Sequence, residues 1–111
     1  MNIQIFGTKK SADTRKAERF FKERRIRYQY IDLNEKGMSR GELKSVSEAV
    51  GGVDALVDIR DADLAAQMSV LVPEQKLDKL LENQSSIKQP VVRNGRSATV
   101  GYQPDIWKIW Q

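Results

Sequence analysis

The residues best suited to chemistry lie together near the start of the chain. Lys9 and Lys10 stand directly before Ser11, and Arg15 and Lys16 follow it closely. A helix is predicted to begin at Ser11, and a helix N-terminus attracts anions through its free N–H groups and its dipole. Four cations around such a start predict a site that binds or stabilises an anion, although a serine there can equally be a simple N-cap.

The composition removes several classes of mechanism. The chain contains no cysteine and no histidine. Disulfides, thiolate nucleophiles and zinc sites built from those residues are therefore excluded, and no metal site is expected. Mechanisms of the Ser–His and Cys–His type are excluded as well, which leaves Ser11 without an imidazole base.

Length and charge limit the possible partners. A chain of 111 residues, 40% hydrophobic and 31% charged, is predicted to form a single domain over 1–111. The net charge is +4, and residues 1–50 hold 12 of the 19 Lys and Arg residues, which indicates an anion site, an acidic partner or a solvated helix face. Without a DNA-reading motif, this charge argues against direct DNA binding.

The chain has no feature of a membrane or exported protein. No apolar run approaches the roughly 20 residues that a membrane helix needs. The first residues lack the basic and apolar regions of a signal peptide. We therefore expect a cytoplasmic protein without membrane contact, and a monomer.

The elements around the basic group follow a strand–helix–strand order. Residues 2–6 and 27–33 have the pattern of strands, and residues 12–25 have the apolar spacing of a helix. Ser11 or Asp13 would be the N-cap of that helix. A connection of this length predicts that the two strands are parallel.

The middle of the chain is predicted to be helical. Ser39 and Glu42 have the spacing of a capping box, and Gly51 and Gly52 end the helix that it opens. Residues 61–70 are expected to be helical. Pro73 then occupies the first position of a further helix.

The last part of the chain has the pattern of a hairpin followed by a helix. Residues 89–93 and 96–100 are predicted to be strands, joined by Asn94 and Gly95 in a two-residue type I′ turn. A final helix starts at Pro104. Ile106, Ile109 and Trp110 are available for burial. Trp107 and Trp110 are expected to be packing residues, the alternative being a binding platform.

These elements together predict an α/β fold. Two parallel strands and an antiparallel hairpin would form a four-stranded mixed sheet flanked by helices. An all-helical insertion at about 38–84 separates the two halves. This order is the thioredoxin-like arrangement.

Several segments match one family in order along the chain. Residues 5–7 and then 11–17, Ser-Ala-Asp-Thr-Arg-Lys-Ala, resemble a strand and loop followed by Cys-x-x-(Cys, Ser or Thr)-Arg-Lys-Ala. The family's second strand is matched by residues 30–33, its Ser-x-x-Glu-Leu segment by residues 39–43 and its proline segment by residues 87–92. Its final hairpin and the segment after it are matched by residues 94–95 and 100–102. The chain thus resembles the ArsC/Spx family of glutaredoxin-type arsenate reductases and Spx transcription regulators.

This resemblance implies a redox site centred on residue 11. The family places its nucleophilic cysteine where this chain has Ser11, and some members place a second cysteine where it has Thr14. Arg15 would support the nucleophile. The implied substrate is a small oxyanion or glutathione, with glutathione or glutaredoxin as electron donor and no bound cofactor. A serine cannot form the arsenic–sulfur or disulfide intermediates, so no turnover is expected for this sequence.

Ser11 itself has three interpretations. It can replace a native cysteine or selenocysteine, mark a natural loss of the nucleophile, or serve only as a helix cap. The basic surroundings favour a replaced reactive residue.

The resemblance also implies three arginines that bind the oxyanion. Arg60 could be the first, although it could instead be a surface residue paired with Asp58 or Asp61. Gln89 occupies the second position, with Arg93 nearby, and the third position has no counterpart. The expected anion-binding set is completed by Lys9, Lys10 and Lys16.

Pro90 is expected by the same resemblance to follow a cis peptide bond beside Ser11. The alternative is an ordinary trans proline that opens a strand. Two other functions stay open: an Spx-like regulator that binds an RNA polymerase subunit or another protein, and an inactive paralogue.

Overall fold

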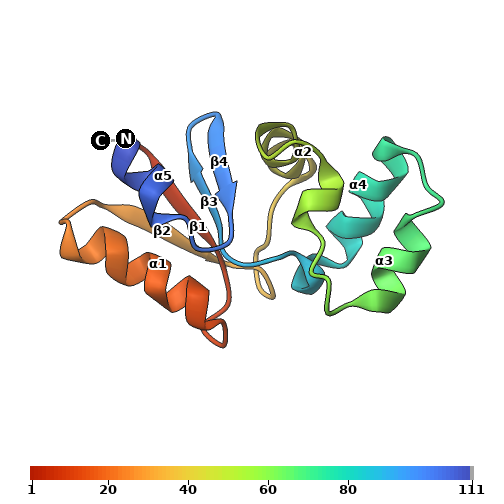
Figure 1. Ribbon diagram of the computed structural model, residues 1–111, viewed down its shortest axis with the longest axis horizontal. Helices are drawn as coiled ribbons and strands as arrows, with labels where there is room; N and C mark the ends of the chain where they lie inside the picture. The colour runs from red at the N-terminus through yellow and green to blue at the C-terminus, as the bar shows by residue number, and fades with distance from the viewer. Residues whose placement is uncertain (111) are drawn as a thin grey trace.

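The computed structural model describes residues 1–110 (Figure 1). The strands are β1 (Ile3–Gly7), β2 (Tyr28–Asp32), β3 (Val91–Asn94) and β4 (Ser97–Val100). The helices are α1 (Ala12–Glu23), α2 (Arg40–Ala49), α3 (Ala62–Met68), α4 (Pro73–Glu82) and α5 (Pro104–Ile109). Two short 3-10 helices, η1 (Val53–Leu56) and η2 (Gln84–Ser86), complete the chain.

The four strands form one mixed sheet in the order β2-β1-β3-β4. β1 pairs with β2 in parallel, and β3 pairs with β1 and with β4 in the antiparallel sense. This is the sheet predicted from the sequence. In Figure 1, α1 and α5 lie on one side of the sheet, and α2, α3 and α4 lie on the other.

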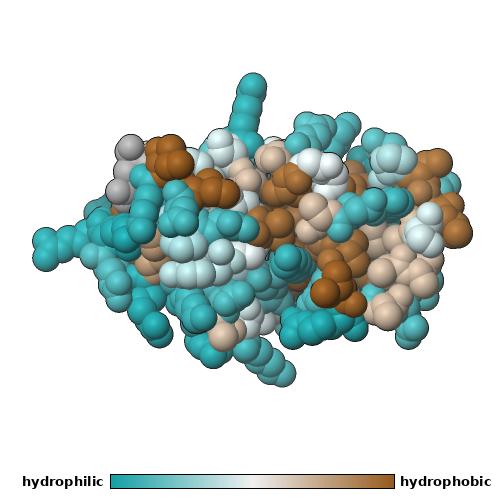
Figure 2. All heavy atoms as spheres, in the orientation of Figure 1, coloured by the Kyte–Doolittle hydropathy of each residue, from teal (hydrophilic) through white to brown (hydrophobic). Residues whose placement is uncertain are grey.

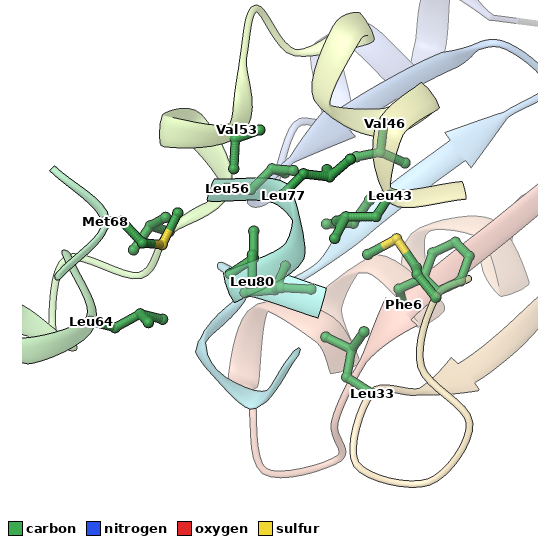
Figure 3. Close-up of a cluster of buried hydrophobic side chains, with 14 of the residues drawn as sticks. Phe6, Leu33, Leu43, Val46, Val53, Leu56, Leu64, Met68, Leu77 and Leu80 are labelled. Carbon is green, nitrogen blue, oxygen red and sulfur yellow. The ribbon is translucent and has the colours of Figure 1, made fainter. Parts of the chain in front are cut away.

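Each face of the sheet packs into its own core because side chains alternate along a strand. Ile3 and Ile5 of β1 point to α1 and α5 and join the cluster around Phe21 and Trp107. Phe6 points to the opposite face and joins the larger cluster with the helical insertion. Figure 3 shows that second cluster, in which Leu80 of α4 lies among side chains from the sheet side and the insertion.

The insertion contains the helices predicted for it, with shorter bounds. The capping box of Ser39 and Glu42 is present at the start of α2. The segment predicted as helical over 61–70 is helical over Ala62–Met68, with Asp61 as its N-cap. The 3-10 helix η1 was not predicted, because four residues are too few to show a period.

The turn between β3 and β4 differs from the prediction. Asn94 pairs with Ser97 at the end of the ladder, so the two turn residues are Gly95 and Arg96. Gly95 has a φ of 62°, whereas Arg96 is not among the residues with positive φ. A type I′ turn needs positive φ at both positions, so the predicted type is wrong, and glycine at the first position fits type II′.

The predicted burial of α5 is wrong for two of its residues. Ile106 and Ile109 are 41% and 80% exposed, whereas Trp107 is fully buried. Residues 107 and 110 share one face of a helix, whereas residue 106 lies at the edge of that face and residue 109 lies about a third of a turn away from it. The two tryptophans therefore fill the narrow contact that a six-residue helix makes with the sheet.

The surface differs between the two sides of the molecule. In Figure 2, the region over α1 is mostly hydrophilic, and apolar patches lie over the insertion and at the α5 end of the molecule. Exposed apolar side chains of the insertion include Ile59, Val70 and Val72. Within residues 1–110, no helix combines the length and the apolar character that crossing a membrane requires.

Candidate functional site

A pocket of about 750 Å³ opens at the N-terminus of α1. Three segments that are distant in sequence line it: the loop from β1 into α1, the loop between η1 and α3, and the residues before β3. The lining residues are Thr8, Lys10, Ser11, Ala12, Asp13, Asp58, Ile59, Arg60, Lys88 and Gln89.

Ser11 is the N-cap of α1. Its backbone is extended, with φ −79° and ψ 120°, and its Oγ accepts a hydrogen bond of 3.2 Å from the Thr14 N–H. The Ser11 N–H donates to the Thr8 carbonyl at 3.1 Å, which closes the loop before the helix. Residue 11 is therefore held at the positive end of a helix of 12 residues, inside a pocket with Lys10.

Gln89 ties the loop and the helix together. Its Oε1 accepts from the Thr8 N–H at 2.7 Å, from the Thr8 hydroxyl at 3.1 Å and from the Thr14 hydroxyl at 3.3 Å. The peptide bond between Gln89 and Pro90 is cis, as expected from the resemblance. No sequence pattern predicts this network, because Gln89 is 75 or more residues away from its partners.

Thr14 does not line the pocket. It is fully buried, with its hydroxyl on Gln89 and its side chain against Gly7. A Cβ at residue 7 would lie 2.4 Å from Thr14 Oγ1 and 2.7 Å from Thr14 Cγ2. Thr14 thus positions the helix start against β1, and Gly7 is needed for that close approach.

Replacing Gly7 with alanine is expected to lower the free energy of unfolding by about 1–3 kcal/mol, because the added methyl overpacks against Thr14. Chemical denaturation followed by circular dichroism measures this change. Gly41→Ala is the matched control, since nothing lies within 4 Å of a Cβ there; its stability should be unchanged or slightly higher. Adding Thr14→Ala to Gly7→Ala should restore part of the loss, and additive losses would contradict the clash.

Only one of the predicted lysines lies in the pocket. Lys10 lines it, whereas Lys9 Nζ pairs with Glu18 at 2.6 Å and lies over the Tyr30 ring at 4.1 Å. Lys16 lines a different groove and pairs with Asp13 at 3.8 Å.

Arg15 supports the loop and not the pocket directly. Its Nη1 donates to the carbonyl oxygen of Lys9. This contact fixes the residues that precede Ser11. Arg15 is therefore a positioning residue in this structure.

Arg60 has the surface pairing that the alternative interpretation predicted, and it also lies at the pocket. It lines the pocket, and its guanidinium pairs with Asp58 at 2.8 Å while 87% of the side chain stays exposed. The hydrogen bonds from Arg60 lower the pKa of Asp58 and raise that of Arg60. A surface pair of this kind is weak, so an anion in the pocket could take over the guanidinium.

The structure separates Arg93 from the pocket and adds Lys88 to it. Arg93 Nη1 lies 3.5 Å from a Glu42 oxygen and donates to Gln4 Oε1 at 3.3 Å. Lys88 stands at the pocket rim directly before Gln89. The sequence signal that could have identified Lys88 as a pocket residue is its position next to the proline segment.

Asp61 anchors the loop that carries Arg60. Its carboxylate accepts from the Ser86 hydroxyl and from the Leu64 N–H at the start of α3. These hydrogen bonds, that of Ser86 first, lower the pKa of Asp61 below its ordinary value of 3.8.

The stability of the protein is expected to fall in acid partly through Asp61. A folded-state pKa below the unfolded one means that the ionised carboxylate stabilises the fold above about pH 4, and that this contribution disappears as the pH falls through the folded pKa. Urea unfolding between pH 6 and about pH 2 measures it. Asp61→Asn, which keeps a capping oxygen, should show a flatter acid limb, and an unchanged slope would contradict the assignment.

The comparisons with known proteins bear on the fold. No family model matches the chain, and no curated protein matches it. Solved structures do. An ArsC family related protein from Bacteroides fragilis superposes with a TM-score of 0.88 at 20% identity, over 100% of this chain and 98% of that one. The fold is thioredoxin-like.

Two further structures give the same result. The arsenate reductase from Vibrio cholerae has a TM-score of 0.83 at 22% identity, over 96% of this chain and 94% of that one. SACOL0876 from Staphylococcus aureus COL has a TM-score of 0.81 at 24% identity, over 96% of both chains. The thioredoxin-like fold with its helical insertion therefore covers nearly the full length in each comparison.

The described residues offer no ligand set for a metal ion. Within residues 1–110, no three His, Cys, Asp or Glu side chains are grouped so that they could hold a metal ion. The pocket instead offers three cations, Lys10, Arg60 and Lys88, against the two carboxylates of Asp13 and Asp58, together with one side-chain amide and the start of a helix. These groups suit an anion.

Proposed function

We propose that this chain belongs to the ArsC family and that its pocket is a glutaredoxin-like site with Ser11 in the nucleophile position. One observation carries the proposal. Ser11 caps α1 in the same pocket as Lys10, Arg60 and Lys88. The ordered sequence motifs and the structural neighbours support it.

The site binds small anions but does not reduce them in this sequence. A serine hydroxyl needs a base before it becomes a useful nucleophile, and the pocket offers none. Asp13 and Asp58 are the carboxylates that line the pocket, and among the described residues neither accepts a hydrogen bond from Ser11. The hydrogen bonds from Arg60 also hold the pKa of Asp58 low, which makes it a poor base. The protein is thus a binding module, or a reductase whose cysteine or selenocysteine has been replaced.

With a cysteine at residue 11 the proposed reaction is thiol–disulfide exchange. The thiolate attacks one sulfur of oxidised glutathione, the glutathione disulfide bond breaks as the mixed disulfide forms, and one glutathione thiolate leaves and takes a proton from water. The thiolate of glutathione or of glutaredoxin would then attack the glutathione sulfur of the mixed disulfide. A new disulfide forms, with oxidised glutathione or glutathionylated glutaredoxin as the product, and the protein thiolate leaves. Arsenate is the weaker substrate candidate, because Gln89 replaces one of the expected arginines.

The test is the Ser11→Cys protein with oxidised glutathione. We expect formation of the mixed disulfide, seen as a mass increase, while the unaltered chain shows none. Ser39→Cys is the matched control, since Ser39 also caps a helix. Equal reaction rates at the two cysteines would overturn the proposal, because they would show that the pocket contributes nothing.

A second candidate is a regulator that binds a protein such as an RNA polymerase subunit. The missing thiol and the basic face of α1 favour it. Immobilised protein should then retain purified polymerase subunits at moderate salt. Failure to retain any of them would count against this candidate and leave the first untouched.

A further inference from the structure

A second pocket, of about 500 Å³, lies between α1 and α5, away from Ser11. Its polar rim is mostly cationic, and Tyr102 is the exposed aromatic ring in it. The lining residues are Lys16, Arg19, Phe20, Glu23, Arg24, Tyr102, Pro104 and Lys108. We call this pocket the α1–α5 groove.

The cations of the groove are poorly neutralised. Among the described residues, Arg19 and Arg24 have no carboxylate partner within 4.0 Å. Lys16 and Lys108 have only exposed partners, Asp13 at 3.8 Å and Asp105 at 3.9 Å. Arg24 instead lies over the Phe20 ring at 3.7 Å, which holds its guanidinium in place. Four cations against Glu23 give the groove a positive field.

Arg25, next to the groove residue Arg24, has a backbone that favours glycine. It has a φ of 58°, and the Arg25 and Ile26 N–H groups donate to the carbonyls of Lys22 and Phe21. This is a Schellman motif, in which glycine is the usual residue at the left-handed position. An arginine there is less stable than glycine would be, so Arg25 offers a variant beside the groove that changes stability without removing a groove residue.

We propose that the α1–α5 groove is a docking site for an acidic segment of a protein partner. Arginine guanidinium groups bind carboxylates in a planar, two-bonded geometry, and Arg19 is free to do so. Tyr102 offers a half-exposed ring beside the cations, and tyrosine and arginine are the residues enriched at the centres of protein interfaces. The site is separate from the Ser11 pocket and does not depend on its chemistry.

The geometry favours a protein over a single-stranded nucleic acid. Nucleic-acid binding of this type needs aromatic faces open for base stacking. Tyr102 meets Trp107 edge-on at 5.5 Å, and Lys16 lies 5.8 Å from the centre of its ring. The only exposed ring of the groove therefore already has neighbours at its face and its edge.

The test measures binding of a fluorescent peptide of alternating glutamate and serine to the full chain, at low and at high salt. We expect binding that weakens as salt rises. Arg19→Glu with Lys108→Glu should weaken it about tenfold or more, since both changes reverse a rim charge. Arg96→Glu, an exposed arginine in the β3–β4 turn outside the groove, is the matched control and should change affinity by less than about twofold.

A third variant separates binding from stability. Arg25→Gly should raise the melting temperature, because glycine suits the backbone, and should change peptide binding by less than about twofold, because Arg25 does not line the groove. Binding weakened as strongly as in the double variant would overturn the groove, since it would assign the effect to the general charge of this face. Equal binding by the double variant and the unaltered chain would overturn the groove.

Two further outcomes are decisive. Tighter binding of an oligothymidylate than of the peptide would overturn the assignment to a protein partner. Ser11→Cys should bind the peptide as the unaltered chain does, since residue 11 does not line the groove. Failure of the redox proposal would therefore leave this result unaffected.

Discussion

A cysteine introduced at residue 11 is expected to have a thiol pKa well below the ordinary value of about 8.5, in the range of about 3.5–7.5 that helix N-termini produce. The thiolate would take the place of Ser11 Oγ, which already accepts the Thr14 N–H at 3.2 Å. The positive end of α1 and the cations Lys10, Arg60 and Lys88 stabilise the charged form. Asp13 and Asp58 oppose them, and Asp58 is already paired with Arg60.

The measurement is the absorbance of the thiolate against pH. Ser39→Cys separates the effect of a helix start from that of the pocket, because Ser39 caps α2 beside Glu42 and lies outside the pocket. We expect its pKa to be higher than that of Ser11→Cys. Adding Lys10→Gln to Ser11→Cys should raise the pKa part of the way back.

An unshifted pKa at residue 11 would give the opposite answer. It would mean that the pocket cations are too solvated to stabilise a thiolate. The Ser11 pocket would then be no reductase site, and the protein-binding candidate would be the better one.

The fold was largely predictable because local patterns determine it. The alternation in β1, the capping box at Ser39 and Pro73 at the first position of α4 are signals within a few residues, and each element lies where they predict. The turn at Gly95 was displaced by one residue because the register of β3 and β4 depends on packing of the sheet against both cores. The burial predicted for α5 was partly wrong because its apolar residues spread over a wider part of the helix surface than the part that contacts the core.

The site was only partly predictable for a different reason. Lysine and arginine side chains are long, and the position of their charged ends depends on which carboxylate they pair with. Glu18 forms an ion pair with Lys9, and Glu42 forms one with Arg93. No spacing pattern in the sequence predicts either pair. In the sequence, Gln89 stands out only because it replaces an expected arginine. In the structure, its side-chain amide oxygen organises the loop before Ser11. Long-range contacts of this kind cannot be predicted from a local sequence pattern.

The largest effect on stability is expected at Trp107, which connects α5 to the rest of the molecule. Its side chain is fully buried, it packs against Phe20 and Phe21 with ring centres 5.3 Å away, and its Nε1–H donates to the Thr99 hydroxyl at 2.8 Å. Trp107→Ala removes the ring and this hydrogen bond and leaves a cavity. We expect it to lower the free energy of unfolding by about 3–5 kcal/mol.

Chemical denaturation measures this loss, and two variants interpret it. Trp107→Phe keeps an aromatic ring but leaves the buried Thr99 hydroxyl without its donor, so it should cost about 1–3 kcal/mol. Trp110→Ala, on the same helix face but only partly buried, should cost less than Trp107→Ala. Since α5 has six residues and cannot be stable alone, its position depends on Trp107. A Trp107→Ala protein no less stable than Trp110→Ala would show that other contacts hold α5, and with it the wall of the α1–α5 groove.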